Sequence, residues 1–493
     1  MRRDTLVIGL IASITCFGAG VAAQGPGTEQ GPSSSQSPYL VRTVPGVVTK
    51  SILTTGDLVG GYRMAGIPDG LGAFDNGDGS FTVLMHHEIP SNLGVVRAHG
   101  GKGAFVSKWV IESDTLEVLR GEDLIKKIYR WNGASWAQIS AGDPALNIGR
   151  LCSADLPDVS AFYDAASGLG TSERIFMGGE EIGDEGRAFG TVVTGADAGS
   201  AYQLGALGHF SWENVVAKPH TGQATVVAGL DDSTPGQVYF YVGAKKSTGN
   251  DVERAGLTGG TLYGLKIDGV PTETNGTTLP ASGARFSLIS LGNVTTQTGA
   301  QIQAAGVAAG VSNMNRPEDG SWDPSDSNNF YFNTTAAFNG ITRVWNLRFD
   351  DPANVLAGGV ATIGVAGPSF DPTKSNAEQD GPRMLDNMTV NDRGQVITLE
   401  DVGNNAYVGG VYMYDPSRGT LARIAEHDPD RFAVGGSNFI TQDEESSGVI
   451  PVSFLGAGKY LIDVQNHKAS ADPELVEGGQ LLLLHIPPGK PVK

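Results

Sequence analysis

The sequence predicts an all-β fold, a six-bladed β-propeller with loop and short helical insertions. Short apolar or alternating runs, rich in aromatic and β-branched residues, recur along the chain, and 70 glycines supply the turns between them. No charge block or linker divides residues 46–490, which are too many for one sandwich core. Radial repetition of four-stranded sheets provides both a core and protected sheet edges, so a propeller is the expected architecture.

The clearest expected strands are the runs at residues 81–85, 104–111, 237–242, 261–266, 344–349, 395–399, 411–414 and 480–486. Helical periodicity is rare, and only residues 121–129 and parts of 295–310 are expected to be helical. Asp75-Asn76-Gly77-Asp78-Gly79 predicts a hairpin turn. No blade repeat such as Gly-His…Trp-Asp is visible, so the blade number rests on a blade length of roughly 70 residues with loops.

Residues 1–23 have the three parts of a secretory signal peptide. Arg2 and Arg3 give a positive start, an apolar run follows, and Val21-Ala22-Ala23 ends it with small residues. We therefore expect cleavage before Gln24 and a periplasmic or secreted protein. An N-terminal membrane anchor is the alternative, and the arginine pair leaves the twin-arginine export route open.

The mature chain is expected to be strongly acidic. The full sequence has a formal charge of −19 and the signal segment carries a net +1, which leaves −20. This balance argues against nucleic acid or an anionic membrane surface as a partner and suits a protein that gathers cations. Residues 24–45, rich in Gly, Ser, Gln and Pro, are expected to form a disordered leader before a propeller at 46–490. We expect a monomer without stable membrane insertion.

The chain has two cysteines, Cys16 and Cys152, and Cys16 leaves with the signal segment. One cysteine cannot form an internal disulfide, so the exported fold must be stabilised by core burial, with metals as a further source. A free cysteine packs as a small hydrophobic residue, so Cys152 alone is either an inert buried thiol or a ligand. Both interpretations stay open at this point.

Eight polar, mostly acidic clusters lie at the ends of expected strands. They are His86-His87-Glu88, Gly178-Gly179-Glu180-Glu181, residues 209–214, Gly229-Leu230-Asp231-Asp232, Arg316-Pro317-Glu318-Asp319, Asp386-Asn387, Asp443-Glu444-Glu445 and residues 463–467. Each cluster alone reads as a solvated, capping or turn-forming group. Carboxylates spaced through a whole propeller can converge only at its axis or on one face, where they repel unless cations neutralise them.

In this order the clusters resemble the PhoX-type alkaline phosphatase family. Met314-Asn315-Arg316-Pro317-Glu318 is similar to the family's Met-Asp-Arg-Pro-Glu, and residues 68–75 followed by His87-Glu88 resemble its stretch ending in Asn-His-Glu. Leu151-Cys152-Ser153 lies where the family places a metal-bound cysteine. Further matches in the same order are Glu180-Glu181, residues 208–213, 227–242, 386–394, 445–448 and 461–467. Trp212, Asn466 and the segment 152–180 depart from the family pattern.

The resemblance implies an exported, metal-dependent six-bladed propeller that uses iron and calcium together. It gives these metal-ligand candidates: Glu88, Cys152, Glu181, Glu213, Asp231, Asp232, Glu318, Asp386 and Glu445. A thiolate among carboxylates is consistent with Fe³⁺, and the surrounding oxygens are consistent with Ca²⁺. Arg316 is the candidate catalytic residue, because a guanidinium makes bidentate bonds to phosphate oxygens.

The expected function is metal-assisted hydrolysis of a small-molecule phosphate monoester. A propeller does not fix its chemistry, because function belongs to the site. A phosphodiesterase, phytase or lactonase on the same scaffold is therefore one alternative. A non-catalytic propeller that keeps calcium for stability and binds a partner is another.

Overall fold

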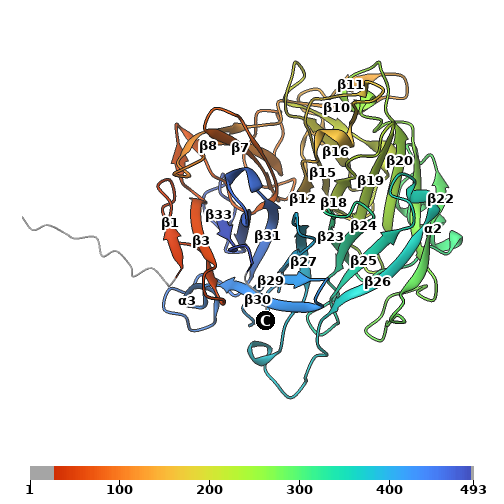
Figure 1. The fold of residues 1–493 in the computed structure, drawn as a ribbon. Coiled ribbons are helices and arrows are strands. Elements are labelled where there is room, and N and C mark those ends of the chain that lie inside the picture. The colour runs from red at the N-terminus through yellow and green to blue at the C-terminus, as the bar shows by residue number, and fades with distance from the viewer. Residues whose placement is uncertain (1–26, 490–493) are drawn as a thin grey trace, which may run out of the picture.

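Six innermost strands form a ring around a central axis in the computed structural model, which describes residues 27–489 (Figure 1). These strands are β6 (Pro68–Asp75), β12 (Leu151–Asp155), β18 (Trp212–Ala217), β23 (Pro317–Trp322), β27 (Leu385–Val390) and β31 (Glu444–Pro451). Each contacts the next, and β31 returns to β6. Every one is an edge strand of a sheet that extends outward, and it pairs antiparallel with the next strand of its blade. The fold is therefore a six-bladed β-propeller, which confirms the predicted fold class.

The outer strands complete the blades in chain order. Blade 1 adds β7 (Ser80–His87), β8 (Phe105–Glu112) and β9 (Val118–Asp123); blade 2 adds β15 (Ile175–Glu180), β16 (Ala188–Val192), β17 (Ser200–Gln203), β10 (Lys127–Trp131) and β11 (Trp136–Gln138). Blade 3 adds β19 (Ala224–Asp231), β20 (Val238–Ala244), β21 (Thr261–Ile267) and β22 (Ala284–Gly292); blade 4 adds β24 (Asn329–Thr334), β25 (Arg343–Phe349) and β26 (Gly359–Ala366). Blade 5 adds β28 (Val396–Glu400), β29 (Gly410–Asp415), β30 (Thr420–His427) and β2 (Leu40–Arg42); blade 6 adds β32 (Lys459–Asn466), β33 (Gly478–His485), β3 (Val48–Thr54) and β1 (Thr28–Gln30). Each of the eight expected strand runs lies in one of these strands and extends beyond it by at most one residue.

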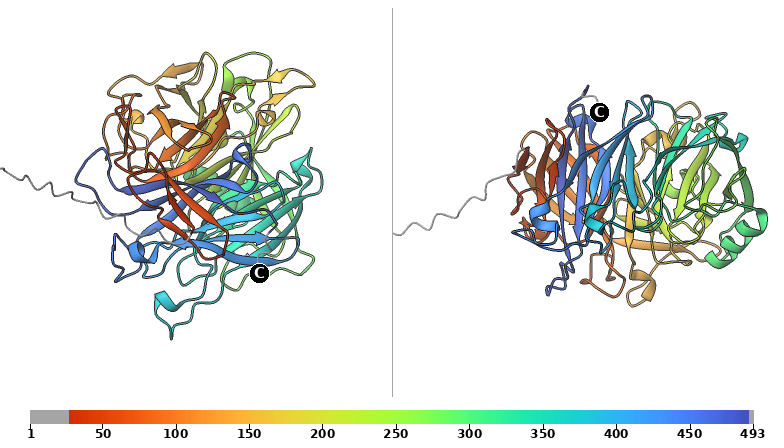
Figure 2. Two further views of the ribbon diagram at one scale, coloured as in Figure 1. Left: turned by 60° about the vertical axis from the view of Figure 1, so that its left-hand side comes forward. Right: turned by 90° about the horizontal axis from the view of Figure 1, so that it is seen from below.

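The ring is closed by strands from both ends of the described chain. The early strand β3 pairs antiparallel with β33 near the C-terminus, with Val48 opposite His485 and Thr54 opposite Gln480. The red and blue ribbons lie side by side in both views of Figure 2. Blade 6 therefore holds the two ends of the propeller together.

The predicted disordered leader is wrong in its described part. In residues 27–45, β1 pairs in parallel with β3 and β2 pairs with β30. Tyr39 and Leu40 are buried in the core. The low-complexity composition does not predict these two strands. They are short edge strands that are ordered by pairing with blades 5 and 6, and they have no alternating pattern of their own.

Blades 3 and 4 share one nine-stranded sheet. Their outermost strands β22 and β26 pair, with Arg285 opposite Val360, and the two ends of the sheet, β18 and β23, meet again at the axis. Between the two blades, Phe240 and Leu265 pack against Phe330, Trp345 and neighbouring apolar residues. Apolar side chains thus fill the space between blades, while polar groups are left to the axis.

Helices are few and lie in the connections. They are α1 (Asp251–Arg254), α2 (Gly299–Ala309) and α3 (Pro429–Phe432). The single-turn 3₁₀ helices are η1 (Pro144–Leu146), η2 (Val159–Ala161), η3 (Gly205–Leu207), η4 (Val355–Ala357), η5 (Asn376–Glu378) and η6 (Ser453–Leu455), and the two-residue strands are β4 (Leu58–Val59), β5 (Tyr62–Arg63), β13 (Tyr163–Asp164) and β14 (Leu169–Gly170). The expected helix within residues 295–310 is confirmed, with a capping box at Thr298. The expected helix at 121–129 is wrong: these residues belong to β9 and β10 and the turn between them.

The predicted signal peptide of residues 1–23 lies outside the described residues, as does Cys16. Across residues 27–489, no helix has the length and apolar character needed to cross a membrane. The predicted hairpin turn at residues 75–79 is confirmed, since it joins β6 to β7.

Gln480 connects the closing strand to the N-terminal segment. Its fully buried side chain accepts a hydrogen bond from Tyr39 N (2.7 Å) and donates to Ser37 O (3.1 Å) and Thr54 Oγ1 (2.9 Å). Gln480→Ala should lower the free energy of unfolding by about 1–3 kcal/mol, since buried groups lose their partners. Urea unfolding measures this change. Gln36→Ala, at an exposed position, is the control and should change it by less than about 0.5 kcal/mol.

Candidate metal centre

The second residue of every innermost strand is an acid or the single described cysteine. These residues are Asp69, Cys152, Glu213, Glu318, Asp386 and Glu445, and they are called the inner ring below. All six are at most 8% exposed. The innermost strands surround the axis (Figure 1), so this position converges there from six blades, at the end of the propeller called the mouth below.

A shift in strand register accompanies each inner-ring residue. Within two residues of the inner-ring position, the pairing of each innermost strand with its neighbour slips, as at Asp69/Leu71 in β6 and Pro317/Gly320 in β23. Such bulges increase local twist and re-aim side chains. The strands also approach closely here: a Cβ on Gly70 would lie 2.5 Å from Ala154 N, so only glycine fits. The bulges and glycines therefore direct acidic side chains toward the axis.

A second set of residues surrounds the first. The residue directly after the second strand of each blade is called the outer ring: Glu88, Glu181, Asp232, Thr335, Asp401 and His467. In every blade its backbone N–H donates to the carbonyl two residues before the inner-ring residue, at 2.8–3.0 Å. The residues whose carbonyls accept these hydrogen bonds are called the flanking positions: Ile67, Arg150, Ser211, Arg316, Met384 and Asp443. The structure thus contains a six-fold repeat of three positions per blade.

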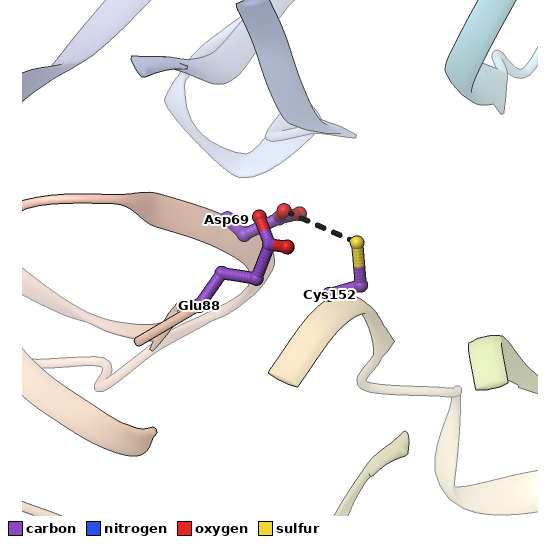
Figure 3. A group of neighbouring side chains, drawn as sticks. All are labelled: Asp69, Glu88 and Cys152. Atoms are coloured by element: carbon purple, nitrogen blue, oxygen red, sulfur yellow. Dashed lines mark hydrogen bonds between the residues drawn. The ribbon is translucent and has the colours of Figure 1, made fainter. Parts of the chain in front are cut away.

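Seven of these side chains form one continuous group of possible ligands. Ligand atoms lie within 4.8 Å of one another in three sets, Asp69–Glu88–Cys152, Cys152–Glu181–Glu213 and Glu213–Glu318–Asp386. Figure 3 shows the first set, in which Asp69 and Glu88 point toward the thiol and Cys152 Sγ lies 3.5 Å from Asp69 Oδ2. Because Cys152 and Glu213 are shared between sets, the group runs across blades 1 to 5.

Neutral side chains hold these acids in place. Gln465 Nε2 donates to both Asp69 Oδ2 and Glu88 Oε2, each at 2.9 Å. Ser153 Oγ donates to Glu213 Oε1 at 2.7 Å, and Asn387 Nδ2 donates in turn to Ser153 Oγ. The acids are therefore positioned through amides and hydroxyls that leave other carboxylate oxygens available.

Burial and mutual repulsion strongly favour the protonated acids. Desolvation, followed by neighbouring carboxylates, raises the pKa of Asp69, Glu318 and Asp386 well above the ordinary range. Desolvation raises the pKa of Glu213 to about 8, and burial among the acids also raises the pKa of the Cys152 thiol. A cation bound among these groups reverses this preference, since it stabilises the deprotonated forms.

Several buried oxygens at this mouth have no hydrogen-bond partner among the described residues. Gln465 Oε1 and Asn387 Oδ1 are of this kind. Unsatisfied buried oxygens are costly, and they are the groups that Ca²⁺ prefers. The donor set therefore fits metal ions, with a thiolate that suits a transition metal at the Cys152 end.

A small cavity of about 70 Å³ follows the innermost strands and is lined in part by Ser153, Asp155, Asp319 and Thr389. Burial raises the pKa of both Asp155 and Asp319 to about 7. Asp319 accepts hydrogen bonds from Asn214 Nδ2 (2.5 Å), Gly320 N (2.6 Å) and Met388 N (2.9 Å). These two acids support the innermost strands and lie outside the three ligand sets.

Of the nine ligand candidates predicted from sequence, six lie in the ligand sets: Glu88, Cys152, Glu181, Glu213, Glu318 and Asp386. Asp232 and Glu445 belong to the outer and inner rings. Asp231 is not brought into the site: its carboxylate accepts from Ser233 Oγ (2.9 Å) and from two backbone N–H groups, so it supports the loop after β19.

Sequence reasoning did not select Asp69, Arg150, Asp401, Asp463, Gln465 or His467 as site residues. Asp69 had a signal, since Pro68-Asp69-Gly70 follows the same pattern as Pro317 and Glu318 with Gly320 shortly after. Asp463, Gln465 and His467 lie in the predicted cluster at residues 463–467, from which no ligand was chosen. Arg150 and Asp401 lie beside strands, and only the register brings them to the mouth.

The departure at Trp212 has a packing explanation. Its indole stacks on Phe210 and lies over Gly179, where a Cβ would come within 2.3 Å of Trp212 Cβ. A side chain at position 179 would collide with the tryptophan, so the two features occur together.

His86 is a buried core residue whose Nδ1 lies 2.7 Å from the Cys152 carbonyl, and desolvation lowers its pKa to about 4.

In the absence of cations, the buried acids at the mouth should make the free energy of unfolding depend on pH. The folded state binds protons more tightly than the unfolded chain at acids with raised pKa, so folding stability must fall as pH rises from about 4 toward about 8. Chelated protein should melt roughly 5 °C or more lower at pH 8 than at pH 5. Melting curves with chelator and with added Ca²⁺ check this. A chelated protein whose melting temperature does not fall over this range would contradict the electrostatic account.

Comparisons with known proteins agree with this architecture. The structure of Pseudomonas fluorescens PhoX in complex with vanadate, a transition state analogue, superposes with a TM-score of 0.56 at 14% identity, over 90% of this chain and 95% of that one. An arabinobiose-bound α-L-arabinanase from Penicillium chrysogenum has a TM-score of 0.41 at 8% identity, covering 91% and 99%. A gluconolactonase from Xanthomonas campestris has a TM-score of 0.37 at 12% identity, covering 95% and 99%. At these identities the first likeness supports the fold alone, and the other two support no argument.

No curated protein sequence matches the chain. A family model described as alkaline phosphatase PhoX matches residues 181–462, which include four of the six inner-ring residues. Since the match spans more than half of its length, the chain belongs to the PhoX alkaline phosphatase family.

Proposed function

We propose that this protein is an exported, metal-dependent phosphatase that hydrolyses small-molecule phosphate monoesters. The observation that carries the proposal is the continuous ligand group across five blades, which ends beside the guanidinium of Arg316. Family membership supports phosphatase activity. The similar Pseudomonas protein binds vanadate, a transition state analogue, and an equivalent oxyanion would suit a mouth of this kind.

Arg316 is the candidate phosphate-binding residue. It lies two residues before Glu318, and its Nε and Nη2 donate to the two oxygens of Asp232 at 2.8 and 2.7 Å, with Glu318 Oε1 at 3.0 Å from Nη2. Its side chain is 29% exposed, and Nη1 has no partner within residues 27–489. The acids therefore orient the guanidinium and leave Nη1 free of protein partners among residues 27–489, so that it can donate to a phosphoryl oxygen.

The ligand sets would hold the metal ions. We assign Fe³⁺ to the group around Cys152 and Ca²⁺ to the carboxylate group of Glu213, Glu318 and Asp386. Bound there, the ions supply Lewis-acid polarisation of phosphoryl oxygens and neutralise the charge that develops during hydrolysis. The chain's own side chains keep the acids in a fixed arrangement, through Gln465 and Ser153, and Arg316 orients the phosphate.

Export is part of the proposal and rests on residues 1–23. If the twin-arginine route is used, the chain folds before export, and the metals can be loaded around Cys152 in the reducing cytoplasm. We further propose that the mature protein acts as a monomer on a diffusible substrate.

Arg316→Ala should raise KM and lower kcat for 4-nitrophenyl phosphate, with kcat/KM falling roughly 100-fold, because charge-assisted hydrogen bonds to the phosphate are lost. Steady-state kinetics of metal-loaded protein measure this. Parallel assays on a diester, phytate and a lactone identify the reaction class. A wild-type protein that hydrolyses monoesters equally well after exhaustive chelation would contradict the metal-dependent mechanism.

Cys152→Ala and Glu318→Gln should each remove bound metal and at least about 10–100-fold of the turnover, since each deletes a side chain of the ligand sets. Elemental analysis of purified protein gives the metal content. Asp350→Asn is the matched control, because Asp350 is an exposed acid on the outer side of blade 4. Variants with full metal content and full turnover would show that the ligand sets are assigned wrongly.

A further inference from the structure

Two arginines occupy equivalent places in the six-fold repeat. Arg150 lies two residues before Cys152 and Arg316 lies two residues before Glu318, so both are flanking residues. Both have left-handed backbone conformations, with φ of 33° and 60°, which the flanking residues Ile67 and Met384 share with φ of 50° and 46°. Each arginine donates its N–H to the carbonyl of the residue after an outer-ring acid of the preceding blade, Ile89 O for Arg150 and Ser233 O for Arg316, both at 3.2 Å. Arg150 and Arg316 thus share both the left-handed conformation and this backbone hydrogen bond.

The side chains repeat the similarity. Arg150 forms an ion pair with the outer-ring acid of the preceding blade, since its Nη2 lies 2.6 Å from Glu88 Oε1. Arg316 does the same with Asp232, the outer-ring acid of the blade before it, at 2.7 Å. Arg150 Nε also donates to Glu181 Oε2 at 3.0 Å. Glu181, which holds Arg150, and Glu318, which lies 3.0 Å from Arg316, each have a carboxylate oxygen within 4.8 Å of one of Glu213. Both guanidiniums are therefore held by acids that meet at Glu213.

Both arginine side chains are also partly exposed. The Arg150 side chain is 46% exposed and the Arg316 side chain 29%, although the acids that hold them are largely buried. Within residues 27–489, no side chain or carbonyl accepts a hydrogen bond from Nη1 of either arginine. The other four flanking positions are Ile67, Ser211, Met384 and Asp443, which carry no positive charge.

We propose that Arg150 is the second arm of a two-arginine clamp that binds the dianionic phosphate of a monoester together with Arg316. The proposal rests on the proposed phosphatase function and names its substrate class more closely. Two guanidiniums offer donors and charge to three terminal phosphoryl oxygens. A phosphodiester has only two such oxygens and one charge, so the clamp favours monoesters.

A purely positioning role is the competing explanation. Arg150 contacts Glu88 and Glu181, both in the ligand sets, so it could act only by holding these acids. Loss of such a role would reduce metal content and would affect monoesters and diesters alike. A clamp role would leave metal content intact and would affect the dianionic ligand selectively.

The test compares Arg150→Gln, Arg150→Lys and the control Arg285→Gln, which removes an exposed arginine paired with Asp350 on the outer strand β22. For each metal-loaded protein we would measure metal content, KM and kcat for 4-nitrophenyl phosphate and for bis(4-nitrophenyl) phosphate, and the dissociation constant of inorganic phosphate by calorimetry. Arg150→Gln should raise the monoester KM and the phosphate dissociation constant roughly tenfold, with unchanged metal content and little change for the diester. Lysine should restore part of the loss, because it keeps the charge but not the planar donor pair.

Three results would overturn the clamp: unchanged monoester KM and phosphate binding in Arg150→Gln, equal losses for both esters, or loss of metal from Arg150→Gln. Each of these is compatible with an active wild-type phosphatase. An inactive wild-type protein would instead refute the proposed function, and the calorimetric measurement would then still decide whether Arg150 binds phosphate.

Discussion

The repulsion among buried acids at the propeller axis is the constraint on which the rest of the structure depends. Six innermost strands bring Asp69, Cys152, Glu213, Glu318, Asp386 and Glu445 to one mouth, with further acids around them. Like charges at such depth ionise together only when cations neutralise them. The acids repel one another, and the fold must hold them together. Blade packing, the closing pair β3–β33 and the glycines near the axis provide this restraint.

Two kinds of cation can neutralise these acids, and they do so at different places. Metal ions fit the three buried ligand sets, beside which Gln465 Oε1 lacks a hydrogen-bond partner among the described residues. Arginines fit the exposed rim, where Arg150 and Arg316 are held by outer-ring acids and keep donors toward solvent. A site of this type is negatively charged inside and positively charged at its edge, which is a suitable place for a phosphate dianion between metal and guanidinium.

Much of the fold could be predicted from sequence, because strand periodicity and glycine-rich turns are local signals. The segment at 121–129 shows the limit, since its spacing fits a helix but its neighbours supply strand partners. The acids Glu213, Glu318 and Glu445 could be named because each lies in a short motif that resembles the family pattern. Arg150 could not, because its role depends on register and bulges. The blade repeat was hidden for the same reason: its three positions hold different residue types in each blade.

The claim that most needs a direct test is that the convergent acids and Cys152 coordinate metal ions. Crystals of the purified protein, measured at wavelengths around the iron absorption edge, provide it. The account predicts anomalous difference peaks within bonding distance of Cys152 Sγ and carboxylate oxygens of the three ligand sets, together with oxygen-bound density of a lighter ion. A mouth without such peaks, in which Asp69, Glu318 and Asp386 form hydrogen-bonded carboxylic acid pairs, would contradict it.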